Sequence, residues 1–164
     1  MNTRAFHKSG VGTILVRPLR DGDADTVAAV FDRLGPVSRS SRFHGPKPRL
    51  ASSDLAALAA VGGNRHVLVA YVEGDPRPVA LARLVRSGDA AEIAFEVADA
   101  HQRRGIGGEL VRMLLADARA AGIARVDAVV ESSNPAALGL LRRVLARRSA
   151  RVEPGGEICV SAVL

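Results

Sequence analysis

One stretch near the middle of the chain constrains the fold more than any other. Residues 91–97 (Ala-Glu-Ile-Ala-Phe-Glu-Val) are largely apolar and strand-like, whereas residues 109–118 carry apolar side chains at helical spacing. The intervening residues 98–108 are rich in glycine and arginine. The pattern therefore predicts a strand that passes through a tight turn directly into a helix.

The glycines of this turn indicate what it could bind. The N–H groups at the start of a helix have no partner within the helix, and the helix dipole favours an anion there. Gly105, Gly107 and Gly108 would let such an anion approach the backbone closely. Arg103 and Arg104 would add positive charge at the rim. We therefore expect the loop to hold a phosphate or pyrophosphate.

Two common phosphate loops do not match this stretch. A dinucleotide-binding Gly-x-Gly-x-x-Gly loop would need a third glycine where Leu110 stands, and there is no Gly-Lys-Ser/Thr sequence. The order Gln-Arg-Arg-Gly-Ile-Gly at 102–107 instead resembles the acyl-coenzyme A pyrophosphate loop of the GNAT N-acetyltransferases.

Composition indicates an ordinary globular protein. Of 164 residues, 48% are hydrophobic and 24% charged, which suits one domain with a sizeable core. We expect a flexible N-terminal segment at 1–12 and a single domain at 13–164. Cys159 is the only cysteine, so no internal disulfide can form. The sequence has no apolar run that would span a bilayer and no signal-like start, so we expect a cytoplasmic protein without membrane association.

Charge and histidine spacing exclude two further classes. The net charge of +6 comes mainly from scattered arginines, without a basic block, so we expect no nucleic-acid partner. His44, His66 and His101 share no metal-ligand spacing, so we expect no metal site.

Hydrophobic periodicity and turn signals give the order β-α-α-β-β-β-α-β-α-β-β, an α/β (α+β) fold with a mixed sheet of about seven strands and four helices. Residues 37–50 contain prolines that exclude a long helix, and we expect this irregular segment to line an acceptor site. The predicted strands lie at 13–19, 66–73, 78–86, 92–97, 125–131, 151–153 and 157–163, and the predicted helices at 21–34, 53–61, 109–121 and 135–147.

This order is similar to the GNAT fold from Thr13 to the C-terminus. In that family the fourth and fifth strands splay apart and the cofactor enters between them. Residues 38–43 (Ser-Arg-Ser-Ser-Arg-Phe), followed by Gly-Pro-Lys-Pro at 45–48, resemble the acetyltransferase domain of bacterial Pat-type protein-lysine acetyltransferases. Residues 91–95 resemble the same group.

The resemblance implies a cofactor site. Val97 and Asp99 would offer backbone groups to the pantetheine arm of acetyl-CoA, and Asn134 would contact the same arm or simply cap its helix. The pyrophosphate would lie against Gln102, Arg103, Arg104, Gly105, Ile106, Gly107 and Gly108.

A protonated amine must lose a proton before it attacks a thioester, and a carboxylate on the adjacent strand can accept it. Glu92 is the first candidate for this base, since the resemblance places the family's catalytic glutamate close to this position. Glu96 is the alternative, because both residues share one strand face. Either carboxylate could instead face solvent or pair with an arginine.

The sequence does not identify a general acid, because Leu141 stands where many GNAT enzymes carry a tyrosine. Tyr71, the only tyrosine, lies in an earlier predicted strand. The thiolate of coenzyme A would leave unprotonated or with help from water, Ser132 or Ser133.

Together these features predict an N-acetyltransferase that moves an acetyl group from acetyl-CoA to an amine. A protein lysine is the first choice of acceptor, and a small-molecule amine or antibiotic is the second. A non-catalytic acyl-CoA-binding sensor is a third possibility. The oligomeric state stays open between monomer and homodimer.

Overall fold

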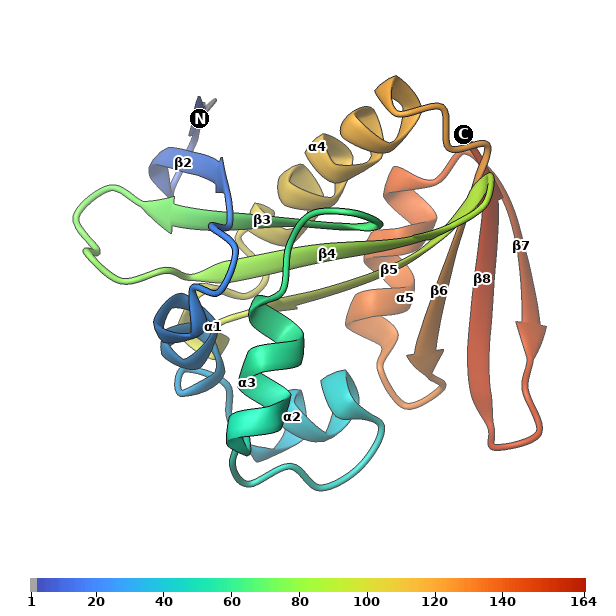
Figure 1. Ribbon diagram of the computed structural model, residues 1–164, viewed down its shortest axis with the longest axis horizontal. Helices are drawn as coiled ribbons and strands as arrows, with labels where there is room; N and C mark the ends of the chain where they lie inside the picture. The colour runs from blue at the N-terminus through green and yellow to red at the C-terminus, as the bar shows by residue number, and fades with distance from the viewer. Residues whose placement is uncertain (1–2) are drawn as a thin grey trace.

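One eight-stranded mixed sheet organises the computed structural model, which describes residues 3–164 (Figure 1). Its strand order is β1-β2-β3-β4-β5-β6-β8-β7. The strands are β1 (Arg4–Lys8), β2 (Gly12–Pro18), β3 (Arg65–Val72), β4 (Ala80–Ser87), β5 (Ala90–Val97), β6 (Arg125–Glu131), β7 (Arg147–Val152) and β8 (Glu157–Val163).

Helices cover both faces of this sheet (Figure 1). They are α1 (Ala24–Phe31), α2 (Pro36–Phe43), α3 (Ser52–Ala59), α4 (Ile106–Ala120) and α5 (Pro135–Val144), with a 3-10 turn at Asp99–His101. Leu110 and Leu114 of α4 pack with Leu68 of β3 in the larger core. Val30 of α1 and Leu81 of β4 belong to a second core on the opposite face. The mixed α+β class is therefore confirmed, with one strand and one helix more than expected.

Among residues 3–164, the only parallel strand pairing is between β5 and β6, and it is short. Ala90–Glu92 lie opposite Arg125–Asp127, and the two strands then diverge (Figure 1). Beyond this point β5 pairs with β4 alone, whereas β6 pairs with β8. The splay that the family resemblance implied is therefore present, and it begins directly after Glu92.

The N-terminal segment differs from expectation. Residues 1–12 were expected to be flexible, but Arg4–Lys8 form β1 and pair with β2. The side chain of Arg4 makes two hydrogen bonds to the carboxylate of Asp117, at 2.9 and 2.8 Å. The contact joins residues that are 113 positions apart, so local sequence does not reveal it. Met1 and Asn2 lie outside the described residues.

Two other segments also depart from the sequence-based boundaries. Pro36 begins α2 instead of separating a helix from a loop, because proline suits the first helical position, where no N–H donor is needed. Near the other end, α5 stops at Val144, before the expected helix end at 147, and β7 starts at Arg147, before the strand expected at 151–153. It is an exposed edge strand, a place where charged side chains are typical.

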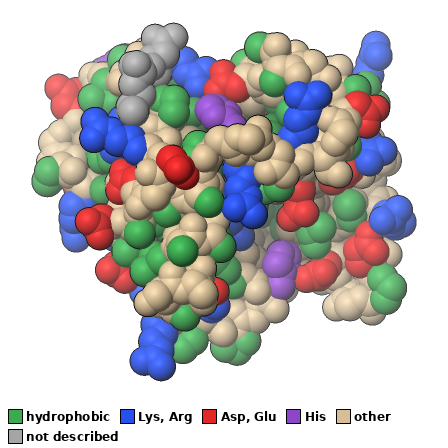
Figure 2. Space-filling model, viewed as in Figure 1, with side chains coloured by type: hydrophobic (Ala, Val, Ile, Leu, Met, Phe, Trp, Pro, Cys, Tyr) green, Lys and Arg blue, Asp and Glu red, His purple; other side chains and the backbone are tan. Residues whose placement is uncertain are grey.

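Charged side chains of both signs are interspersed over the face seen in Figure 2. Within residues 3–164, none of the helices combines the length and hydropathy of a membrane span. The same residues contain no group of three or more His, Cys, Asp or Glu side chains that could hold a metal ion.

Candidate functional site

The glycine-rich loop contains the left-handed backbone that glycine permits. Gly105 is the N-cap of α4 and has φ of +78°, a left-handed conformation that glycine adopts without steric cost. Arg103 is also left-handed, at φ +58°. These two residues turn the chain sharply from the 3-10 segment into α4, so the first N–H groups of α4 emerge at the loop. The geometry fits the binding of an anion at this helix start.

The three glycines of the loop have different surroundings. A Cβ at Gly105 would collide with Cε of Lys8, whereas at Gly108 the nearest atom would be 3.8 Å away, on Arg112. A Cβ at Gly107 would lie 3.1 Å from side-chain atoms of both Leu140 and Val97. Gly107 therefore lets α4 pack closely against α5 and β5.

The contact of Lys8 with Gly105 was not expected from the sequence. Lys8 ends β1, and the following turn accepts a hydrogen bond from Arg104, whose guanidinium lies 3.3 Å from the carbonyl of Gly10. The N-terminal hairpin therefore brings an additional cation to the glycine loop. Sequence reasoning missed Lys8 because the segment around it was expected to be flexible.

Gln102 cross-links the loop to its neighbours. Its side-chain amide lies 3.1 Å from Oγ of Ser38, 3.1 Å from the carbonyl of Val97 and 3.2 Å from Asp99 Oδ1. The main-chain N–H of Asp99 donates to the carbonyl of Arg33 at 3.1 Å. In this arrangement Gln102 and Asp99 position the loop, and the Asp99 N–H is already used within the fold.

His101 is buried beside the loop and anchors it. Its Nδ1 lies 3.5 Å from the Arg33 guanidinium, which binds the Asp75 carboxylate at 2.6 Å. Burial, together with the charges of Arg33 and Arg104, lowers the pKa of His101 despite the opposing effect of Asp75. Hydrogen bonds from Arg33 and the Arg77 N–H lower the pKa of Asp75. In this cluster of His101, Arg33 and Asp75, the arginine and the carboxylate thus form an ion pair beside a neutral imidazole.

The edge of β5 that faces β6 offers main-chain groups. The N–H of Ala98 donates to the carbonyl of Val79 at 2.8 Å, which fixes the phase of the β4–β5 ladder. Because ladder groups alternate in direction, the main chain of Phe95 and Val97 points away from β4, toward the diverging strand β6. This edge can therefore bind an extended ligand, although the Val97 carbonyl already accepts a hydrogen bond from Gln102.

Glu92 lies at the point where the two strands separate. It is the last β5 residue paired with β6, opposite Asp127, and its side chain is exposed. Glu92, Ala94 and Glu96 alternate onto the sheet face that carries α1, α2 and α3. A carboxylate here is accessible to an amine that enters from that face.

Glu96, unlike Glu92, is bound in an ion pair. Its Oε2 lies 2.6 Å from Nε of Arg42, and the side chains of Arg42 and Glu96 are only 15% and 9% exposed. The shared face of the two glutamates was expected, and the structure separates them into one exposed carboxylate and one buried ion pair.

The residues considered for the pantetheine arm and the general acid also have defined positions. Asn134 caps α5, with its Oδ1 accepting from the N–H of Ala137 at 3.0 Å. Leu141 is fully buried in the core. Tyr71 receives a hydrogen bond from Arg17 at 2.6 Å, on β3. None of these contacts places a phenol beside the β5–β6 edge.

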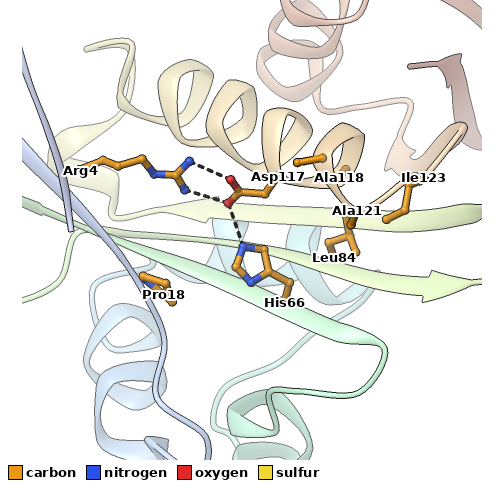
Figure 3. Close-up of a pocket in the computed structure, with 9 residues that line it drawn as sticks. Arg4, Pro18, His66, Leu84, Asp117, Ala118, Ala121 and Ile123 are labelled. Atoms are coloured by element: carbon orange, nitrogen blue, oxygen red, sulfur yellow. Dashed lines mark hydrogen bonds and ion pairs between the residues drawn. The ribbon is translucent and has the colours of Figure 1, made fainter. Parts of the chain in front are cut away.

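A separate pocket of about 500 Å³ lies beside the C-terminal half of α4 (Figure 3). On its rim, Asp117 binds Arg4 and also His66, whose Nε2 lies 2.9 Å away (Figure 3). Burial acts to raise the pKa of Asp117, but hydrogen bonds from Arg4 and His66 lower it overall. The pocket is distinct from the glycine loop, at the opposite end of α4.

The family model described as "Acetyltransferase (GNAT) family" matches residues 36–146, which include the glycine loop, β5, β6 and all of α5. The chain belongs to this family. An acetyltransferase of Pseudomonas aeruginosa is 27% identical over 128 residues, which cover 75% of this chain and 69% of that protein.

Two solved structures resemble the fold. The GNAT domain of S. lividans PAT is 28% identical, with a TM-score of 0.88, and the match covers 99% of this chain and 97% of that one. The cAMP-binding acyltransferase from Mycobacterium smegmatis is 22% identical, with a TM-score of 0.68. This GNAT chain spans 47% of that longer protein, so the second likeness concerns the fold alone.

Proposed function

We propose that this protein transfers an acetyl group from acetyl-CoA to an amine. The observation that carries the proposal is the glycine loop at the start of α4 beside the unpaired edge of β5. The loop provides N–H groups and cations for the pyrophosphate, and the edge provides main-chain groups for the pantetheine arm. The exposed carboxylate of Glu92 lies at the end of that edge.

Glu92 acts as the general base in this proposal. The ammonium of the acceptor loses a proton to the carboxylate, directly or through one water, and the free amine then attacks the thioester carbonyl. Glu96 does not take this role, because its carboxylate is bound to Arg42. The buried Leu141 supplies no proton, so the thiolate leaves as the anion or takes a proton from water.

A protein lysine is the acceptor that we favour. The support comes from the Pat-like segment 38–43, which forms most of α2 and contacts β5 through Arg42. The likeness to the GNAT domain of S. lividans PAT over nearly the whole chain adds to this support.

The decisive experiment is incubation of purified protein with isotopically labelled acetyl-CoA and a cell lysate, followed by mass spectrometry of proteins and metabolites. Label on lysine side chains, together with release of free coenzyme A thiol, supports the proposed acceptor. Label on metabolites alone would replace it with a small amine. Cofactor binding without any thiol release would instead indicate an acyl-CoA sensor.

A further inference from the structure

Arg83 is a buried cation in an otherwise apolar part of β4. Only 8% of the residue is exposed, although arginine is rarely buried without a partner. Its Nε and one terminal nitrogen are buried and have no hydrogen-bond partner among the residues described. Because unpaired buried donors are costly, native proteins normally satisfy them, often with a ligand or water.

The charges around Arg83 do not balance it. The carboxylate of Glu96 acts on it, but that carboxylate is already bound to Arg42 at 2.6 Å. Arg65 adds a further positive charge. Burial, Arg42 and Arg65 together lower the pKa of the Arg83 guanidinium against the opposing effect of Glu96. Among the described residues, no carboxylate therefore pairs with the orphaned donors of Arg83, and Arg42 and Arg65 add positive charge.

The sheet register places Arg83 beside the proposed base. Arg83 pairs with Ala94 on β5, and Glu92 is two residues before Ala94 on the same face. Such diagonal positions are about 7–8 Å apart in an antiparallel pair. The small side chain of Ala94 lies between the buried cation and the exposed carboxylate.

We propose that Arg83 binds a carboxylate of the acceptor, so that the preferred amine carries an acidic group a few bonds away. The inference rests on the proposed acetyl transfer, in which Glu92 faces the amine. The planar guanidinium fork suits a carboxylate, which would satisfy the two orphaned donors. The carboxylate comes either from an acidic residue next to a lysine in a protein or from a free amino acid.

The first test measures stability without any substrate. If the role of Arg83 is to bind a ligand, Arg83→Met should unfold at the same or a higher urea concentration than wild type. The apolar side chain removes the unpaired buried charge. A clear fall in the midpoint would assign Arg83 to the fold and overturn the proposal. Succinate should raise the wild-type midpoint saturably and leave that of Arg83→Met unchanged. A wild type that does not respond to succinate contradicts the anion site.

The second test measures acceptor preference. A lysine peptide with adjacent glutamates is compared with its glutamine counterpart, and free glutamate with free glutamine. In one of these pairs, wild type should favour the acidic member by ~10-fold or more in kcat/KM, as expected for a charge-assisted hydrogen bond. The preference should fall to within about two-fold in Arg83→Met and persist in Arg119→Met, a remote exposed control.

The two proposals fail in different ways. Equal rates with acidic and neutral acceptors overturn the role of Arg83 and leave the acetyltransferase intact. Absence of thiol release with every amine counts against the acetyltransferase, whereas the succinate measurement still decides the anion site.

Discussion

Arg42 holds the carboxylate of Glu96 by an ion pair of 2.6 Å, and both side chains are largely buried. The pair joins α2 to β5 and leaves Glu92 as the exposed carboxylate of the same strand face. One contact between residues 54 positions apart thus gives the two glutamates different properties.

Loss of Arg42 should destabilise the protein. Arg42→Ala leaves the Glu96 carboxylate buried without its cation, and breaking such a pair typically costs about 3 kcal/mol. Urea unfolding measures the change, and Arg42→Lys is the matched control, since it keeps the charge and should lose less. An unchanged unfolding free energy in Arg42→Ala would mean that water or the neighbouring Arg83 compensates the Glu96 carboxylate.

Glu92→Gln should reduce kcat strongly. The substitution keeps the shape of the side chain and removes its basicity, and a positioned general base typically contributes ~10²–10⁴-fold. Cofactor affinity, measured by calorimetry, should change little, because Glu92 lies at the opposite end of the β5 edge from the glycine loop. A variant with wild-type kcat would show that acceptors bind already deprotonated.

Gly105 should tolerate no side chain. Gly105→Ala forces alanine into a left-handed conformation, which costs roughly 1–2 kcal/mol, and its Cβ would displace the flexible end of the Lys8 side chain from the loop. We expect acetyl-CoA affinity to fall at least ~10-fold, equivalent to about 1.4 kcal/mol. Gly108→Ala is the control, because its Cβ meets no atom closer than 3.8 Å. Equal affinities of the two variants would remove Gly105 from the cofactor site.

His101 should make the fold sensitive to mild acid. The pKa of the buried imidazole is lowered in the folded protein, whereas the unfolded chain has the ordinary value of about 6.5. As the pH falls below that value, the unfolded chain takes up a proton that the folded protein resists, so this contribution to stability is lost. Above the unfolded pKa both states are neutral and the contribution is constant.

Urea unfolding at pH 7.5 and 5.5 checks this expectation. Wild type should lose more stability between the two values than His101→Gln, which has no titrating group at this position. If wild type and variant lose the same amount, other groups dominate the acid response and the His101 cluster is not its source.

Local signals in the sequence predicted much of the fold. The bounds of β6 at 125–131 and β8 at 157–163 are those observed, and the Asn134-Pro135 start of α5 was also correct. The Gly35-Pro36 pair shows a limit of prediction from local sequence. It was expected to end a helix, but α1 already ends at Phe31 and the pair starts α2, because the same proline that breaks a helix interior is favoured at a first turn.

The candidate site was predictable only in part. Residues 102–108 and Glu92 could be named because their spacing is local, whereas the contacts of Lys8 and Arg42 depend on the tertiary fold. Arg83 did carry a signal, since it interrupts the apolar run from Val79 to Val85. A lone charge in a buried strand is informative because it must find a partner.

The three-residue pairing of β5 with β6 has a consequence for hydrogen exchange. The amide protons of Phe95 and Val97 point toward the diverging strand and not into the β4 ladder. In the free protein they should exchange faster than those of Ala94 and Glu96, which donate to β4. An extended ligand lying along the β5 edge would slow only the first pair. The pattern of amide protection along β5 would therefore show which residues of its diverging edge are covered by the ligand.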